Sequence, residues 1–175
     1  QETMYPIEGK ISITAQGADA VKVRIPAWCE KFSLNKPYTL NGGYAEIIND
    51  GTPIEIEFDM APFAVTSDSR VAADVNKICI QAGPVVYCAE SIDNIENLHA
   101  LCFSSDFEYS MEYNDSIGLN TLTVSGYAAV NQNGLYSRAR RELKRIKIRL
   151  IPYSAFANRG QADMLVWFSD VTLSL

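Results

Sequence analysis

The residues of this 175-residue chain best suited to bond-breaking chemistry are its carboxylates. Hydrolysis of a glycosidic bond typically uses two carboxyl groups that flank the scissile bond. Glu90 and Asp93 are the one pair that we would test for this role, although both could equally cap turns. Acidic residues are common, and the sequence alone does not show which two would lie close together. We therefore predict no catalytic residue in this chain. The carboxylates considered are Glu90, Asp93, Glu96, Asp106, Glu108 and Glu112.

Other reactive groups are few. His99 is the single histidine, and no serine or cysteine nucleophile motif surrounds it. The four cysteines form no CxxC pair, and their spacings match no common zinc ligand pattern, so we predict neither a metal nor a cofactor site. Cys79 and Cys88 lie in apolar, strand-like surroundings, which favours buried free thiols; a Cys79–Cys88 disulfide is the alternative.

Strands are the elements that would position these groups. Polar and apolar residues alternate over 10–14, 21–25, 53–58, 119–124 and 145–150. Alternate side chains of a strand point to opposite faces, so each segment predicts a half-buried strand. Asn- and Gly-rich turns separate the segments, while signals for helix are weak. The pattern predicts an all-β fold of two packed antiparallel β-sandwich lobes, jelly-roll-like and with little helix.

The boundary between the two lobes is expected near the Gly83–Pro84 strand, where a polar, irregular stretch begins at Glu90. We therefore predict one β-sandwich over residues 1–88 and a second over 89–175. The strand 84–89 could belong to either lobe. The chain opens on a polar segment without a starting Met, which favours a mature form or a piece of a longer protein.

Charge and hydropathy restrict the class of partner. The formal net charge of −6 argues against binding nucleic acid, which requires a basic face. No apolar run approaches the length of a membrane-spanning helix, so we predict no membrane partner. Seven of the fifteen Lys and Arg nevertheless lie within residues 138–149. They indicate an anionic partner such as an acidic glycan, a phosphate or an acidic protein face, a docking surface for another domain, or the solvated face of a loop and strand.

Two aromatic segments, residues 25–29 and 151–160, suggest a carbohydrate site. Aromatic rings can stack on sugar faces, and Asn and Arg side chains can bind hydroxyl groups. The same rings could instead close the ends of a sandwich by burying their large apolar area. The candidate residues for contact with a glycan or another domain are Trp28, Tyr153, Phe156, Asn158 and Arg159.

Several motifs, taken in order, resemble the C-terminal portion of the bacterial β-L-arabinofuranosidase family, glycoside hydrolase family 127, formerly a domain of unknown function. The stretch from Ile151 to Gly160 is the most specific of them, and the resemblance covers nearly the whole chain. The motifs are Arg24-Ile25-Pro26-Ala27-Trp28-Cys29, Gly43-Tyr44-Ala45, Arg70-Val71-Ala72, Gly83-Pro84-Val85-Val86-Tyr87-Cys88-Ala89-Glu90 with Asp93-Asn94, Ile151-Pro152-Tyr153-Ser154-Ala155-Phe156-Ala157-Asn158-Arg159-Gly160, and Met164-Leu165-Val166-Trp167.

The resemblance implies that the chemistry lies outside this chain. In that family an N-terminal (α/α)6 barrel holds the active site, with a glutamate and a zinc-bound cysteine nucleophile, and two β-sandwich domains follow. Cys29 and Cys88 match the sandwich motifs, so neither inherits the nucleophile or zinc role. The implied partners are the barrel of the same polypeptide, a plant-type glycan for the parent enzyme and, as a further possibility, a second copy in a homodimer.

We therefore expect a non-catalytic C-terminal portion of an arabinofuranosidase-like hydrolase, which supports the barrel and contributes oligomer or substrate-cleft contacts. An independent carbohydrate-binding module is the alternative, and a small hydrolase using Glu90 and Asp93 is the third hypothesis. A secreted or periplasmic location is favoured over the cytoplasm by the expected plant-glycan substrate, although the sequence itself carries no leader that would assign a compartment.

Overall fold

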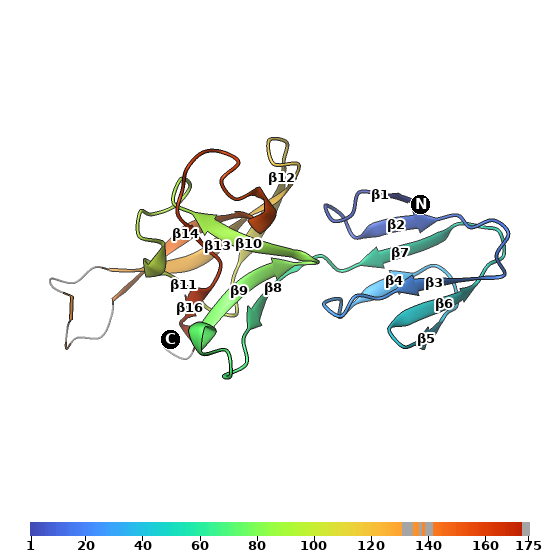
Figure 1. The fold of residues 1–175 in the computed structure, drawn as a ribbon, viewed down its shortest axis with the longest axis horizontal. Helices are drawn as coiled ribbons and strands as arrows, with labels where there is room; N and C mark the ends of the chain where they lie inside the picture. Colours follow the sequence, from blue (N-terminus) through green and yellow to red (C-terminus); the bar gives the residue numbers. More distant parts are fainter. Residues whose placement is uncertain (131–134, 137, 139–141, 173–175) are drawn as a thin grey trace. The chain divides into compact units, whose positions relative to one another are not determined.

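The computed structural model describes residues 1–130, 135, 136, 138 and 142–172. Strands dominate this part of the chain, as the alternating sequence predicts, and its helical segments are three single turns of 3-10 helix. The chain divides into two compact units, Gln1–Ala61 (unit 1) and Pro62–Leu175 (unit 2) (Figure 1). The 3-10 turns are η1 (Ala72–Asp74), η2 (Leu98–Ala100) and η3 (Tyr153–Ala155).

Unit 1 consists of two antiparallel sheets. One has the strand order β1-β2-β7-β4 and the other the order β3-β6-β5. The strands are β1 (Glu2–Thr3), β2 (Lys10–Ile13), β3 (Ala20–Arg24), β4 (Phe32–Leu34), β5 (Thr39–Asn41), β6 (Tyr44–Ile48) and β7 (Ile54–Phe58).

Alternation of side chains builds the core of unit 1. In β7 the isoleucines and the phenylalanine are buried while Glu55 and Glu57 are exposed, as their places in the alternating pattern require. Ala45, Ile47 and Ile54 form the buried centre, and the apolar faces of β2, β3 and β4 pack around it. The turn between β5 and β6 uses Gly42 and Gly43 at φ 57° and 81°, a region that favours glycine.

Unit 2 is built on one large sheet with the path β15-β10-β14-β13-β11-β16-β9-β8. β12 pairs with β13 outside this path, and β9 also pairs with β10. The strands are β8 (Pro62–Thr66), β9 (Lys77–Ala82), β10 (Val85–Glu90), β11 (Leu101–Phe103), β12 (Tyr109–Asn114), β13 (Leu119–Ala129), β14 (Leu143–Pro152), β15 (Met164–Leu165) and β16 (Phe168–Asp170).

The β9–β10 pairing closes this sheet into a ring. From β10 the ring runs through β14, β13, β11 and β16 to β9 and back to β10, and only the β11–β16 pair is parallel. The main hydrophobic core of unit 2 is drawn from these strands and includes Ile80, Leu101, Leu122, Ile148 and Phe168, each fully buried. Closure leaves few free strand edges in this unit, which protects the backbone polar groups from unwanted pairing.

The boundary predicted between residues 88 and 89 is corrected by the structure. It falls inside β10, whose residues Tyr87 and Cys88 pair with β14 and whose next two residues pair with β15. A strand hydrogen-bonded on both sides of that point cannot separate two units, so β10 belongs wholly to unit 2. The change of unit lies at Ala61–Pro62. The boundary expected from the sequence lies too late because the polar, irregular stretch that begins at Glu90 resembles a junction between lobes, although it lies within unit 2.

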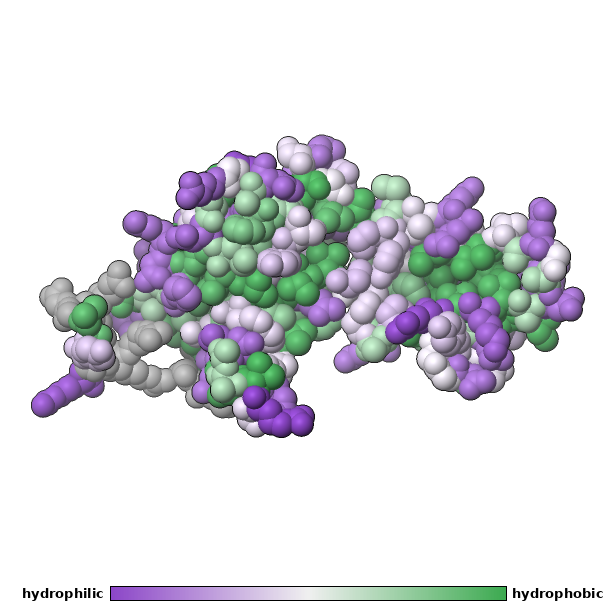
Figure 2. Space-filling model, viewed as in Figure 1, coloured by the Kyte–Doolittle hydropathy of each residue, from purple (hydrophilic) through white to green (hydrophobic). Residues whose placement is uncertain are grey.

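The surface of unit 2 is unevenly polar. Figure 2 shows apolar side chains (green) at the surface of this unit on the viewed face. The exposed large apolar residues of β12 are Tyr109, Met111 and Tyr113, which are 45%, 38% and 50% exposed. We refer to these three side chains as the β12 apolar face.

Candidate functional site

Glu90, Asp93 and Arg159 form one cluster in unit 2. Glu90 ends β10, Asp93 follows it in a turn, and Arg159 lies in the segment after η3. The guanidinium of Arg159 donates from Nη1 to Asp93 Oδ1 at 3.1 Å, and its Nη2 contacts both Asp93 Oδ2 and Glu90 Oε2. The two carboxylates that sequence singled out are therefore brought together, but on a single shared cation.

The cluster is largely shielded from solvent. The side chain of Glu90 is 1% exposed and that of Arg159 is 27% exposed. The hydrogen bonds to Asp93 are the main cause that raises the pKa of Arg159 above its ordinary value; burial opposes the shift and Glu90 adds to it. The remaining oxygen of Glu90 accepts a hydrogen bond of 2.9 Å from the backbone N–H of Ala157, which has φ 63°.

This arrangement favours a structural role for the two carboxylates. A glycosidase needs one carboxyl group as acid and another as base or nucleophile, each facing the bond that is cleaved. Here both oxygens of Glu90 and both of Asp93 are occupied by one guanidinium and one backbone amide. The contacts join the end of β10 to the segment that follows η3, two parts of the chain far apart in sequence.

The other candidates near η3 differ in accessibility. Tyr153 is 52% exposed, and the side chain of Asn158 is exposed as well. Phe156 is half-buried and packs against the cluster formed by Cys88, Ile151 and Ala155. Tyr153 and Asn158 thus remain available for contacts, whereas Phe156 and Arg159 contribute to the packing of unit 2.

Trp28 lies in unit 1, after β3. Its ring meets Phe58 edge to face, with centroids 5.9 Å apart, and the residue is half-buried. The interaction closes the end of the sheet that contains β7, which is the packing interpretation of this aromatic segment. Because Trp28 and Tyr153 belong to different units, each is treated as a separate candidate.

The other reactive side chains of the chain are its four cysteines and its single histidine, His99. All four cysteines are free; Cys79, Cys88 and Cys102 are buried and Cys29 is half-buried. Burial, helped by the charge of Glu90, raises the pKa of Cys88 to about 12, so its thiol stays protonated at neutral pH. His99 is exposed in η2. Over residues 1–130, 135, 136, 138 and 142–172, no group of three His, Cys, Asp or Glu side chains could hold a metal ion.

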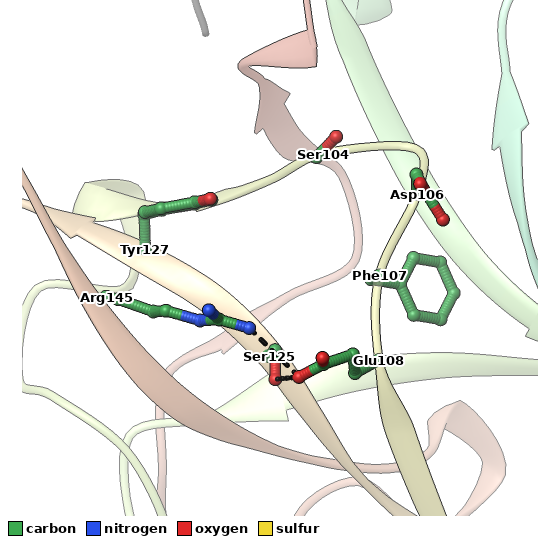
Figure 3. A pocket seen from close by; sticks show the side chains of 7 residues that line it. All are labelled: Ser104, Asp106, Phe107, Glu108, Ser125, Tyr127 and Arg145. Carbon is green, nitrogen blue, oxygen red and sulfur yellow. Dashed lines mark hydrogen bonds and ion pairs between the residues drawn. The ribbon is translucent and has the colours of Figure 1, made fainter.

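A polar cavity lies on the outer face of β13 and β14 (Figure 3). It has a volume of about 230 Å³. A second cavity, of about 510 Å³, shares Glu108, Ser125 and Arg145 with the first and adds Ile146 and Lys147. The residues that line the first cavity are Ser104, Asp106, Phe107, Glu108, Ser125, Tyr127 and Arg145.

Hydrogen bonds link the polar groups of these two cavities. Arg145 Nη2 donates to Glu108 Oε2 at 2.9 Å, and Ser125 Oγ donates to the same oxygen at 3.2 Å. Lys147 Nζ in turn donates to Ser125 Oγ at 2.8 Å. Figure 3 shows Arg145 and Ser125 converging on the Glu108 carboxylate from neighbouring strands.

The basic run 138–149 ends on this face, although Arg140 and Arg141 lie outside the described residues. Arg145 and Lys147 are exposed and Arg149 is half-buried, while Ile148 and Leu150 point into the core, as the alternation predicts. Sequence reasoning missed Ser125 and Tyr127, which register alone places opposite Lys147 and Arg145. The sequence feature that could have indicated these two residues is the polar face of a strand formed by alternate positions Thr121, Thr123, Ser125 and Tyr127.

No helix in the part of the chain that the structure describes is long and apolar enough to cross a membrane.

Comparison with known proteins identifies relatives for nearly the whole chain. A non-reducing end β-L-arabinofuranosidase of Bifidobacterium longum subsp. longum is 29% identical over 198 aligned residues, which cover 95% of this chain and 29% of that protein. The crystal structure of a GH127 β-L-arabinofuranosidase from Geobacillus stearothermophilus T6 matches with a TM-score of 0.85 and 27% identity, over 97% of this chain and 30% of that one.

Two further solved structures give the same result. One, described as a glycoside hydrolase, has a TM-score of 0.83 and 30% identity, over 96% of this chain and 31% of its own. The other, a GH127 β-arabinofuranosidase, has a TM-score of 0.80 and 29% identity, over 97% of this chain and 31% of its own. The chain therefore spans about three tenths of the length of these relatives.

The match to a protein family falls on unit 2. Residues 62–169 match the family described as the glycoside hydrolase family 127 C-terminal domain, and this range begins where unit 2 begins. The resemblance that the sequence motifs indicated is thus confirmed by the family match, by the curated relative and by the solved structures. This chain belongs to glycoside hydrolase family 127, through the C-terminal domain of that family.

Proposed function

We propose that this chain is a non-catalytic supporting portion of a β-L-arabinofuranosidase-like hydrolase, and that its β12 apolar face packs against the remainder of such a polypeptide. The relatives are about three times as long as this chain, which leaves room for a catalytic part elsewhere. The carboxylates Glu90 and Asp93, held by Arg159, provide contacts within unit 2.

The observation that carries the proposal is the register of β12 on β13. Tyr109 pairs with Val124 and Met111 with Leu122, and directly opposed residues of a sheet point to the same face. Val124 and Leu122 are fully buried core residues. The β12 apolar face therefore continues the core side of the sheet, yet its side chains are 38–50% exposed. Contiguous exposed apolar side chains of this kind mark contact surfaces.

The test compares this chain with a longer GH127 polypeptide that carries it together with the N-terminal portion present in its relatives. Hydroxyl-radical labelling followed by mass spectrometry measures the accessibility of Tyr109, Met111 and Tyr113. We expect strong labelling in the 175-residue chain and protection in the longer polypeptide. Tyr136, which is 95% exposed, serves as the reference site. Equal labelling of the β12 apolar face in both proteins would contradict its role as a contact surface.

The non-catalytic part of the proposal has its own assay. The 175-residue chain is incubated with aryl L-arabinofuranosides of both anomeric configurations, beside its Glu90→Gln variant. We expect neither protein to release the aryl group faster than buffer. Hydrolysis by the parent chain that disappears in Glu90→Gln would show instead that this carboxylate is catalytic.

A second candidate function is carbohydrate binding at η3. The observation that favours it is the exposure of Tyr153, whose ring is available for stacking on a sugar, and Asn158, five residues on, is exposed as well. Titration with neutral arabino-oligosaccharides, for the parent chain and for Tyr153→Ala, tests it. Binding that is lost in Tyr153→Ala would support this candidate, and absence of binding at millimolar concentration would exclude it.

A further inference from the structure

The outer face of β13 and β14 carries a charge pattern unlike the rest of the chain. The protein has a formal net charge of −6, yet Arg145, Lys147 and Arg149 follow one another on alternate positions of one strand face. Opposite them, in register, are Tyr127, Ser125 and Thr123 of β13. Cations and hydroxyl groups therefore share a surface that contains no carboxylate of either strand.

Glu108 shows how a carboxylate is bound there. It lies just before β12, and its Oε2 accepts hydrogen bonds from Arg145 at 2.9 Å and from Ser125 at 3.2 Å. The side chain of Glu108 is 75% exposed and that of Arg145 is 66% exposed, so solvent reaches this pair and the contact can exchange. Glu108 therefore occupies a place that a carboxylate from a ligand could take.

The positive charge of Lys147 is not neutralised by a carboxylate among the described residues. Its ammonium donates to Ser125 Oγ at 2.8 Å, and no carboxylate among the described residues lies within ion-pair distance of it. Lys147, Arg145 and Glu108 line the 510 Å³ cavity together, which leaves one positive charge in excess. The volume is within the usual range of small-molecule sites, about 300–1,000 Å³.

The adjoining 230 Å³ cavity offers groups of a different kind. Tyr127 contributes an aromatic ring with a hydroxyl, Ser104 a second hydroxyl and Asp106 a carboxylate that can accept from ligand hydroxyls. Figure 3 shows Tyr127 beside Arg145, its partner in register, and Ser104 and Asp106 on the segment that leads to Glu108. A ligand that fits both cavities combines a carboxylate with several hydroxyl groups and an apolar C–H face.

We propose that these two cavities form a binding site for a carboxylate-bearing saccharide, a hexuronate unit within an oligosaccharide. The hexuronate carboxylate would bind at Lys147 and Arg145 in place of the Glu108 carboxylate. The hydroxyl groups of the adjoining sugar would face Asp106, Ser104 and Tyr127. This site depends on neither the β12 apolar face nor the non-catalytic role argued above.

Calorimetric titration of the 175-residue protein with an oligogalacturonate trisaccharide tests the proposal, beside neutral galactotriose and sodium acetate as comparison ligands. We expect heat of binding for the oligogalacturonate alone, with an affinity that falls as salt is raised. Equal binding of the neutral trisaccharide would assign the site to neutral sugars, and binding of acetate alone to simple anions. Absence of binding by all three ligands at millimolar concentration would overturn the proposal as well.

Variants locate the site. Lys147→Ala should weaken oligogalacturonate binding by about tenfold, the typical effect of losing a hydrogen bond to a charged group. Glu108→Gln should strengthen it, because the competing carboxylate is neutralised, whereas a purely structural Glu108–Arg145 pair predicts no gain. Lys144→Ala is the matched control, since Lys144 is exposed on the opposite face of the same strand. Unchanged affinity in both Lys147→Ala and Glu108→Gln would place any binding elsewhere, against the proposal.

Discussion

Glu90 and Arg159 are separated by 69 positions in the chain and meet in an ion pair whose carboxylate is 1% exposed. The pair ties the end of β10 to the segment after η3, and Asp93 shares the same guanidinium. The contact therefore fixes two distant parts of unit 2 to each other, as the pairing of strands in the closed ring also does.

Removing Glu90 should destabilise the protein. In Glu90→Ala, Arg159 loses one of its two carboxylate partners and the Ala157 N–H loses its acceptor. Because Asp93 still binds the guanidinium, we expect a loss of about 1–3 kcal/mol, the cost of leaving a buried polar group unsatisfied. Urea unfolding followed by circular dichroism measures the loss. Glu112→Ala, on the exposed strand β12, is the control and should change stability little. A Glu90→Ala protein as stable as the control would show that the pair contributes no net stability.

Alkaline pH should destabilise unit 2 through Cys88 and Tyr87. Burial raises the pKa of Cys88 from 9.0 to about 12 and that of Tyr87 from 10.0 to about 12. Above pH 9 the unfolded chain loses these protons before the folded chain does, so stability present at lower pH is lost as the pH rises toward 12. Each group contributes at most about 1.4 kcal/mol per pH unit within its own window.

Melting temperatures recorded from pH 8 to 11 check this expectation. Cys88→Ala should flatten the decline between pH 9 and 10. In this range the unfolded chain already loses the Cys88 proton, whereas Tyr87, with its ordinary pKa of 10.0, still keeps its own. A decline of the same slope in parent and variant would assign the effect to other groups.

Gly126 should resist substitution, because it lies inside the ring of unit 2. A Cβ at this position would be 2.6 Å from Ile148 Cδ1 and 2.9 Å from Phe103 Cε1. Overpacking of this kind costs about 1–3 kcal/mol, so Gly126→Ala should lower the denaturation midpoint. Adding Ile148→Val removes the nearer atom, and the double variant should lose less stability than the two single variants added together. Strict additivity would contradict this account of the clash.

The β12 apolar face should contribute little to the stability of the isolated chain. Met111→Ser and Tyr113→Ser remove side chains that are 38% and 50% exposed, so each should change the free energy of unfolding by less than about 1 kcal/mol. The same changes should reduce the fluorescence of a bound hydrophobic dye and any self-association seen by sedimentation. A large loss of stability would show instead that these side chains are core residues of unit 2.

The sequence by itself determined the class of fold, the family and much of the strand pattern. Alternation of polar and apolar residues located β2, β3, β7, β13 and β14, because the period of two is a local property of an extended backbone. It also placed Arg145 and Lys147 outside and Ile148 inside. The segment from Ile151 to Gly160 indicated the family for the same reason: its residues are contiguous and need no knowledge of distant contacts.

Only the tertiary structure decided which distant residues meet. The unit boundary lies at Ala61–Pro62 and not between residues 88 and 89. The sequence could not show that β10 belongs wholly to unit 2, because its partner β14 lies far along the chain. Glu90 and Asp93, singled out as a candidate catalytic pair, proved to share Arg159, a residue that sequence had assigned to a glycan or domain contact. The cavity at Ser125 arises from the β13–β14 register, since register is set by long-range hydrogen bonds and a shift of one residue would turn every side chain to the other face.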